Sequence, residues 1–339
     1  MKTTFIVSVA FCAMLIFNAQ AQQRVARHSA GVTSIYSTTT PFVDAYNDAI
    51  AGDTIYLPGG AMAAPSTIDK PLTIIGAGFH PDSTNATFLT KLTSAIAIGE
   101  NADDLHFEGI HFETSVSSNS NVSFNNSEFK RCFFNATFNV SGVSGNYTEN
   151  LVVSECVLKG ALNIQNTRNC LFSNNIFSDQ INQSSSNLYA NNVFLREGGS
   201  AGSATYRTFY NTFNNVFENN VFYNSLIYSI YGSGNTFQFN LFVNTSPELG
   251  TGFIDINNYF GIAQASIFVN QVGFLWATTN DIHLQDPVTY IGADATPVGV
   301  YGGYFPFKTG AVPVNPHISS KTISNQTDVN GDLNIQILT

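Results

Sequence analysis

A repeat of about 22 residues runs through most of this 339-residue chain and constrains its fold more than any other feature. In each of eight short segments, an Asn or a residue that replaces it lies two places before an aromatic or aliphatic residue. The segments end at Phe112, Phe134, Leu158, Phe177, Phe194, Phe222, Phe242 and Phe268. Repeats of roughly 20 to 50 residues are typical of solenoids, in which each unit stacks on its neighbours. The spacing therefore predicts a stack of coils.

A second row of large residues precedes the first by five positions. Its members are Phe107, Phe129, Val153, Phe172, Tyr189, Phe217 and Phe237. The two rows predict two vertical stacks of side chains, each inside a column of parallel strands. Asn175, Asn192, Asn220 and Asn240 fall between the rows, at a bend where Asn tolerates the left-handed backbone that a sharp corner demands. Their amides are expected to bond to one another along the column, as in other stacked Asn ladders.

The cysteines that follow the N-terminal apolar run are Cys132, Cys156 and Cys170. Cys132 and Cys156 occupy the repeat position of the bend Asn in successive coils, where parallel strands would put their backbones ~4.8 Å apart. Side chains that point the same way in register suit the torsion of a disulfide poorly. We therefore expect buried thiols that replace Asn in the stack, and the spacing has no metal-binding motif such as C-x-x-C.

Asn pairs alternating with Phe or Val suit strands and bends better than helix interiors, and the frame of leucine-rich repeats is absent. From about Asp53 to Tyr304 the chain resembles the right-handed parallel β-helix superfamily, the fold of pectate lyases. The resemblance rests on the Asn-x-Phe bend. It implies an all-β, right-handed parallel β-helix solenoid and is specific for that fold rather than for an activity.

The two ends of the chain carry different signals. Residues 1–21 read as a secretory signal peptide, with Lys2, an apolar run and the small-residue site Ala19-Gln20-Ala21. In residues 22–52, Thr40 is the expected N-cap of a capping helix that Gly52 ends. The apolar face of that helix comprises Phe42, Ala45, Tyr46, Ala49 and Ile50.

The β-helix is expected over residues 53–304, and residues 305–339 read as a Pro-rich linker and a C-terminal hairpin that turns at Asn330-Gly331. The segment Asn280–Leu284 resembles the closing coil of uncharacterised exported β-helix proteins of the Bacteroidetes type. The hairpin strands, 322–329 and 333–338, are expected to cover the C-terminal edge or to begin an attachment element.

Charge limits the partners of this chain. The formal net charge is −10, and no cluster of basic residues exceeds Lys130-Arg131. Nucleic acid is thus a poor partner, and an acidic polysaccharide would be repelled unless calcium or a basic patch offset the field. After the signal no apolar stretch is long enough for a membrane helix. We expect a monomer that is secreted or lies in the periplasm or at the cell surface.

The longest gap between well-formed repeats, 28 residues from Phe194 to Phe222, holds the candidate ligand-binding residues. They are Arg196, Glu197, Tyr206, Arg207 and Tyr210. In a polysaccharide lyase, an Arg from this loop would abstract the proton beside a uronic carboxylate, with calcium neutralising that carboxylate. The simpler interpretation is a Gly-rich loop that carries ordinary surface charges. No residue is a confident catalytic group, and we expect no metal site and no cofactor other than calcium in the lyase case.

Other candidates carry weaker signals. Asp281, His283 and Asp286 form an acid-His-acid cluster that suits a metal or, more simply, a capping role. His106 and His111 are expected to face solvent. Aromatic residues that would form sugar-stacking platforms, or would equally well be packed, are Trp276, Tyr223, Tyr228, Tyr231 and Tyr259.

Three functional classes stay open. A non-catalytic carbohydrate-binding or cell-surface structural protein fits the uniform Asn-rich coils best. A lyase or glycoside hydrolase acting on an acidic glycan is the alternative, although the repeats lack the clustered carboxylates that hydrolysis needs. An ice-binding solenoid would require a regular Thr array that these coils do not have.

Overall fold

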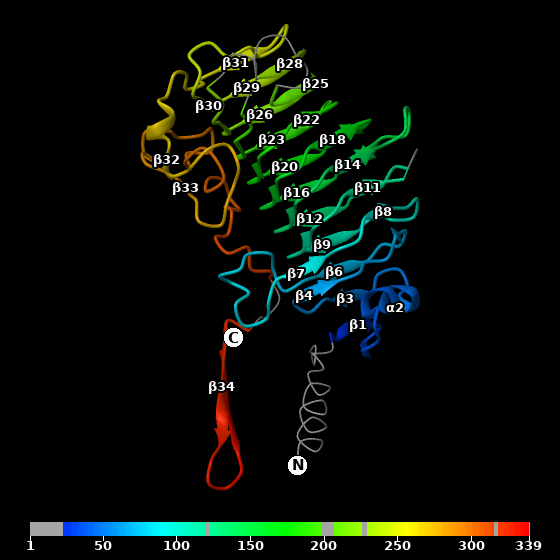
Figure 1. Cartoon of the computed structure of the whole chain (residues 1–339). Coiled ribbons are helices and arrows are strands. Elements are labelled where there is room, and N and C mark those ends of the chain that lie inside the picture. The colour runs from blue at the N-terminus through cyan, green and yellow to red at the C-terminus, as the bar shows by residue number, and fades with distance from the viewer. Residues whose placement is uncertain (1–22, 120–121, 198–206, 226–228, 315–317, 339) are drawn as a thin grey trace, which may run out of the picture.

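The computed structural model describes residues 23–119, 122–197, 207–225, 229–314 and 318–338. Within these residues the strands form a parallel β-solenoid with three large sheets of twelve, nine and eight strands (Figure 1). This confirms the predicted fold class. The predicted signal peptide at residues 1–21 lies outside the described residues. No helix in the described part of the chain is long and apolar enough to span a membrane.

Each of the eight coils from β3 to β28 contributes one strand to each of the three sheets, and the last turns contribute strands to only one or two of them. In spatial order, the twelve-stranded sheet contains β2 (Val32–Tyr36), β1 (Val25–Ser29), β3 (Thr54–Tyr56), β6 (Thr73–Ile75), β9 (His106–Glu108), β12 (Glu128–Lys130), β16 (Val152–Ser154), β20 (Leu171–Ser173), β23 (Leu188–Ala190), β26 (Val216–Glu218), β29 (Thr236–Gln238) and β31 (Ile254–Ile256). The nine-stranded sheet contains β30 (Leu241–Phe242), β27 (Val221–Phe222), β24 (Val193–Phe194), β21 (Ile176–Phe177), β17 (Val157–Leu158), β13 (Phe133–Phe134), β10 (His111–Phe112), β7 (Thr90–Leu92) and β4 (Gly60–Met62). The eight-stranded sheet contains β28 (Ile230–Ser233), β25 (Phe209–Phe213), β22 (Ile181–Asn182), β18 (Leu162–Gln165), β14 (Phe138–Ser141), β11 (Val116–Ser118), β8 (Ile96–Ile98) and β5 (Thr67–Ile68). A small pair, β15 (Thr148–Glu149) and β19 (Thr167–Arg168), lies beside them.

The solenoid core is built from side chains that repeat at the same place in each coil. Both predicted rows are buried, and their rings stack in register: Phe217 lies 4.8 Å from Phe237, and Phe222 lies 4.5 Å from Phe242. A third inward row belongs to the eight-stranded sheet and was not predicted. It contains Val116, Phe138, Leu162, Ile181, Phe209 and Ile230.

The Asn ladder is confirmed, with one correction. The Nδ2 group of Asn192 donates to Oδ1 of Asn220 at 3.0 Å, and Asn220 donates to Asn240 at 2.9 Å, so the buried amides bond along the column. The left-handed residue, however, is the one before each ladder Asn: Asn191 and Asn219 have φ values of 55° and 57°. The ladder Asn is buried inside the solenoid, and the residue before it adopts the left-handed conformation that makes the bend.

Two of the cysteines, Cys132 and Cys156, continue the same column. Cys132 and Cys156 are buried free thiols, as predicted. Cys170 is also a buried free thiol, and its backbone N–H donates to Oδ1 of Asn187 at 3.0 Å, in a separate ladder. The backbone N–H of Cys156 donates to Oδ1 of Asn175 at 2.9 Å, so Cys156 stands below the amide ladder in place of an Asn. Burial raises the pKa of Cys156 well above that of an ordinary thiol.

The helix α2 (Pro41–Asp48) lies at the N-terminal end of the solenoid and packs beside β1 and β2. Its side chains Phe42, Ala45 and Tyr46 are buried in the core, as predicted. Ile50 was predicted to share this face but is 62% exposed, because the helix has already ended at Asp48. Strand β1 pairs antiparallel with both β2 and β3, which covers the first edge of the sheet.

The prediction that Gln264–Phe268 forms a further coil is wrong. This segment contains a short 3₁₀ helix, η2 (Gln264–Ser266), and enters β32 (Phe268–Asn270), which pairs antiparallel with β33 (Asp281–Leu284). The parallel stack ends at β31. From there the chain turns back along the outside of the nine-stranded sheet toward the first coils, as Figure 1 shows in yellow and orange.

Residues 290–314, here called the strap, cover a second apolar core on the outer side of the nine-stranded sheet. The strap residues Val298, Val300 and Ala311 belong to this core. Its outward sheet residues are fully buried: Val157, Ile176, Val193, Val221 and Leu241. These strands are therefore apolar on both faces, because the solenoid interior covers one face and the strap covers the other.

The C-terminal hairpin is confirmed, with β34 (Ser320–Thr327) paired antiparallel to β35 (Leu333–Leu338) and a left-handed Gly331 in the turn. It does not cover the C-terminal edge of the solenoid. The strap carries it to the other end of the molecule, where it projects beyond the N-terminal coils (Figure 1).

Candidate functional site

A column of polar and aromatic side chains runs along the outer face of the eight-stranded sheet. Side chains alternate between the two faces of a strand, so the residue after each inward apolar residue points outward. These outward residues are Ser117, Asn139, Asn163, Asn182, Tyr210 and Tyr231, one in each successive coil. Within the column, the Nδ2 group of Asn182 donates to Oδ1 of Asn163 at 2.8 Å, and Asn139 donates to Ser117 at 3.1 Å. We call this set the outer column.

Two tyrosines form the end of the outer column. The rings of Tyr210 and Tyr231 are stacked, with centroids 5.3 Å apart and planes 17° from parallel. Tyr231 is 48% exposed, so one ring of the stack is open to solvent. The residues before them, Phe209 and Ile230, are buried in the core and fix the position of each strand.

A buried arginine supports the tyrosine stack. The guanidinium of Arg207 lies 5.1 Å from the centroid of the Tyr231 ring. Its Nη1 group donates to the Glu248 carboxylate at 2.8 Å and to the Ile230 carbonyl at 3.1 Å. The Arg207 side chain is buried, with 7% exposed. Its charge is paired with Glu248, and the hydrogen bonds hold the guanidinium beside the Tyr231 ring.

The structure brings together only part of the predicted site. Arg207 and Tyr210 both contact the Tyr231 ring. Arg196 instead pairs with Asp179, and burial lowers the pKa of its guanidinium. Glu197 is exposed at the end of a described segment, and Tyr206 lies outside the described residues.

The other aromatic candidates are mostly packed. Tyr223 is buried against Phe268, and the Tyr259 hydroxyl donates to the Ile291 carbonyl at 2.9 Å. Trp276 contacts Phe133, with ring centroids 6.0 Å apart. Tyr228 lies outside the described residues. Tyr231 is thus the platform candidate with the most accessible ring among those that the structure describes.

A charged cluster under the strap was missed at the sequence level. Arg131 is buried between two buried glutamates, with Nη1 2.9 Å from Glu108 and Nε 2.9 Å from Glu155. The strap joins the cluster, because the backbone N–H of Val314 donates to Glu108 and that of Lys308 donates to Glu155. Arg131 and Glu155 occupy the same position in successive repeats, and this spacing of opposite charges could have predicted the ion pair from the sequence. The cluster holds the strap on the solenoid.

His106 does not face solvent as predicted. Its Nδ1 lies 2.9 Å from Glu128, and its Nε2 lies 3.6 Å from Glu108. Burial alone would lower the pKa of His106, but the hydrogen bonds to these two carboxylates outweigh burial and raise the pKa to about 9. His106 therefore extends the charged cluster with a second cation.

His111 was also predicted to face solvent and is instead half-buried, 4.6 Å from the Phe133 ring. Burial, aided by the nearby Lys91 charge, lowers its pKa to about 4. The two histidines are only five residues apart, yet their surroundings move their pKa values in opposite directions.

The acid-His-acid candidate is only partly assembled. His283 Nδ1 lies 2.6 Å from Asp281, whereas Asp286 accepts a hydrogen bond from the backbone of Thr289. Among the residues that the structure describes, no group of three or more His, Cys, Asp or Glu side chains could hold a metal ion. A calcium site is therefore not supported by any described cluster.

The fold and the outer column define an all-β solenoid with an amide and aromatic surface. Comparison of the sequence and structure with protein-family models, curated proteins and solved structures found no match. The resemblance to the pectate-lyase superfamily accordingly rests on the shared parallel β-solenoid architecture alone.

Proposed function

We propose that this protein binds a neutral, linear polysaccharide along the outer column, with Tyr231 as the principal stacking platform. The observation that carries the proposal is the exposed Tyr210–Tyr231 stack, held by buried Arg207, in line with a row of amides. An exposed aromatic ring covers the apolar face of a sugar well. The neighbouring amides supply the hydrogen bonds that orient hydroxyl groups.

The amide row suits a polymer better than a single sugar. Each column Asn donates one of its two N–H groups to the coil below, as in Asn182 to Asn163. The second N–H and a carbonyl lone pair are left for a ligand. Because parallel strands repeat every ~4.8 Å, these groups recur along the solenoid axis. A glycan chain lying along that axis would meet similar partners coil after coil.

Charge favours a neutral ligand over an acidic one. The chain carries a net charge of −10, and Arg207, the cation that contacts the Tyr231 ring, is paired with Glu248. A uronic acid polymer would therefore find no uncompensated positive charge at this guanidinium. The same pairing argues against Arg207 as the base of a lyase, because its Nη1 group already donates to the Glu248 carboxylate and to the Ile230 carbonyl. With the predicted signal peptide, the proposal describes an exported, non-catalytic carbohydrate-binding protein.

Affinity electrophoresis of the purified chain from residue 22 on a panel of neutral and acidic polysaccharides tests this function. We expect retardation by at least one neutral glycan and a loss of affinity of about tenfold or more in Tyr231→Ala. Tyr304→Ala is the matched control, because Tyr304 is 89% exposed on the strap and lies outside the outer column. It should bind as the parent protein does.

Two results would overturn the proposal. One is the absence of retardation across a broad panel, and the other is equal binding by Tyr231→Ala and the parent. A parallel assay for reducing ends and unsaturated products, with and without calcium, separates binding from cleavage. Cleavage of an acidic glycan that disappears in Arg207→Ala would establish the lyase alternative instead.

A further inference from the structure

A cavity of about 450 Å³ lies between the β32–β33 hairpin and the strap, away from the outer column. Its floor is apolar and buried, formed by Phe268, Ile282, Val298, Val300 and Phe307. Protein interiors contain few voids larger than a water molecule, whereas small-molecule sites have volumes of roughly 300 to 1,000 Å³ and mostly apolar walls. The size and lining of this cavity are those of a ligand site.

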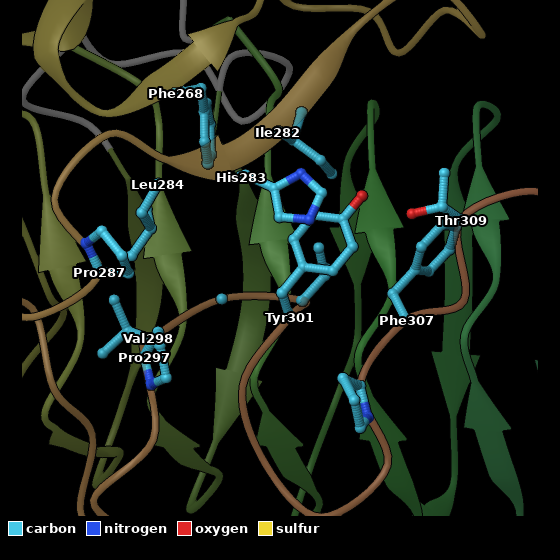
Figure 2. Close-up of a pocket in the computed structure, with 13 residues that line it drawn as sticks. Phe268, Ile282, His283, Leu284, Pro287, Pro297, Val298, Tyr301, Phe307 and Thr309 are labelled. Carbon is cyan, nitrogen blue, oxygen red and sulfur yellow. The ribbon is translucent and has the colours of Figure 1, made fainter.

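One wall of the cavity is a fixed pair of rings. His283 and Tyr301 are stacked with centroids 3.7 Å apart and planes within 3° of parallel. Figure 2 shows His283 over Tyr301, with Leu284 and Pro287 to one side and Phe307 to the other. Phe307 meets the Tyr301 ring edge-on at 6.2 Å. The rings of His283, Tyr301 and Phe307 are therefore held against one another, and all three line the cavity.

Asp281 holds this wall in place. Its Oδ1 atom accepts hydrogen bonds from the backbone N–H of His283 at 3.1 Å and from Nδ1 of the same residue at 2.6 Å. These bonds lower the pKa of Asp281, so the carboxylate stays charged. His283 is half exposed, and without these bonds its side chain would rotate freely, since ordering a side chain costs conformational entropy. Fixing the ring through Nδ1 leaves Nε2 to bond with a ligand.

The polar side chains that line the cavity are His283, Tyr301 and Thr309. Burial raises the pKa of Tyr301, with a hydrogen bond to Thr309 acting against it, so the hydroxyl stays neutral. Among the residues that the structure describes, neither Lys nor Arg lines the cavity. Such a lining disfavours sugars, which would leave hydroxyl groups unpaired, and also disfavours anions. It suits a planar apolar molecule that has one hydrogen-bonding group.

We propose that the cavity between β33 and the strap binds a small, uncharged aromatic molecule, which packs on the His283–Tyr301 stack and bonds to Nε2 of His283. This site is separate from the proposed glycan surface, so either proposal can fail alone. The three prolines at the cavity, Pro287, Pro297 and Pro306, restrict the backbone around it and help to keep it open without a ligand.

Titration of the full mature chain with N-phenyl-1-naphthylamine, a neutral aromatic amine that fluoresces in apolar surroundings, tests the proposal. We expect saturable binding at one site per chain. In Leu284→Trp the larger ring should fill the cavity, and the signal should be lost. Val288→Trp is the matched control, because Val288 is 81% exposed nearby and does not line the cavity. Its titration should match that of the parent.

A second variant keeps the test decisive if Leu284→Trp does not fold. His283→Ala removes a half-exposed side chain, and we expect it to weaken binding about tenfold while circular dichroism and thermal melting stay unchanged. The proposal is overturned by a titration of the parent that does not saturate, or by equal binding in folded His283→Ala and the parent. Equal loss in Leu284→Trp and Val288→Trp would also count against it.

Discussion

At the scale of single residues, the corner position of each coil decides how the strap is attached. This position has a left-handed backbone and points out of the solenoid, as in Arg131, Glu155 and Asn174. The Asn174 amide donates to the Val300 and Gly302 carbonyls of the strap at 2.9 and 2.8 Å. The corner residues thus do two things, because they turn the chain and bind the segment that covers it.

The buried arginine gives the first prediction. Arg131→Met would leave Glu108 and Glu155 without their shared cation, and removing one partner of a buried ion pair costs about 3 to 5 kcal/mol. We expect that loss in the free energy of unfolding measured by denaturant titration. Hydrogen exchange should also accelerate at strap residues 306–314. Lys130→Met is the control, because Lys130 lies 3.9 Å from Glu155 and is less buried, and its loss should cost under about 1 kcal/mol.

Neutralising the carboxylates separates charge from packing in this cluster. Adding Glu108→Gln and Glu155→Gln to Arg131→Met should restore part of the lost stability, since the uncompensated charges are gone. If the combined variant is less stable than Arg131→Met alone, the ion pairs are not what Arg131 contributes.

His106 gives a pH prediction. Its folded pKa of about 9 lies above the usual value of about 6.5, so the folded protein holds this proton more tightly than the unfolded chain does. The resulting stability is fully present below pH ~6.5 and is lost as pH rises toward ~9. We expect the parent to lose on the order of 1 to 3 kcal/mol over this window. His106→Gln should lose less, and parallel curves for the two proteins would contradict the assignment.

At the scale of elements, each strand of the coils contains only two to five residues and depends on the coils above and below. Rings of neighbouring coils stack along the inward rows with centroids 4.5 to 5.3 Å apart, so one missing ring opens a gap between its neighbours. Strands this short would not be stable alone. Their stability comes from the continuous stack.

Phe222→Ala tests that dependence. Phe222 is 1% exposed and contacts rings in the coils on both sides, and truncating a buried Phe costs about 3 to 5 kcal/mol. Phe305→Ala is the control, because Phe305 is 76% exposed and its loss should change stability by less than about 0.5 kcal/mol. Chemical denaturation that shows under 1 kcal/mol for Phe222→Ala would contradict its place in the stack.

Spacing alone predicted the rows that repeat at fixed intervals, and these are the inward rows and the Asn ladder. The strap was missed although a signal was present. From Phe134 onward, the residue before each member of the first row is also apolar, as in Val193 before Phe194 and Val221 before Phe222. Two consecutive apolar residues in a strand point to opposite faces, so the pattern required a second cover on the outside.

The candidate site was predicted in part for a similar reason. Arg207 and Tyr210 lie close in the sequence, and the long interval between repeats pointed to both. Glu248, the partner of Arg207, is 41 residues away, and Tyr231 comes from the next coil. Intervals here vary from coil to coil, so sequence spacing could not place these residues side by side.

At the scale of the whole molecule, the strap links coils that are far apart in the sequence. Its residues 293–302 contact the coils of Asn219 and Asn174, and residues 308–314 contact those of Glu155, Arg131 and Glu108. An ordinary solenoid has contacts only between neighbouring repeats. Here the strap adds long-range contacts, which favours unfolding of the coils as one unit.

Truncation tests the role of the strap. A chain of residues 23–261 would expose Val157, Ile176, Val193, Val221 and Leu241 on the outer sheet face, a contiguous apolar surface that favours association. We expect aggregation or a lower midpoint of denaturation, measured by light scattering and chemical unfolding. A chain of residues 23–317 retains the strap and lacks only the exposed hairpin, so it should behave as the full chain does. A monomeric, equally stable 23–261 chain would show that the strap is dispensable.

The strap also sets the size of the molecule. Each contact of the strap is made with one particular coil, so the length of the strap has to match the number of coils. One more coil would lengthen the stack by ~4.8 Å, more than one extended residue spans. The strap residues would then no longer lie beside the coils that they contact, unless the strap were longer by one or two residues. Coil number and strap length can therefore change only together, and this solenoid has a defined length although it is built from repeats.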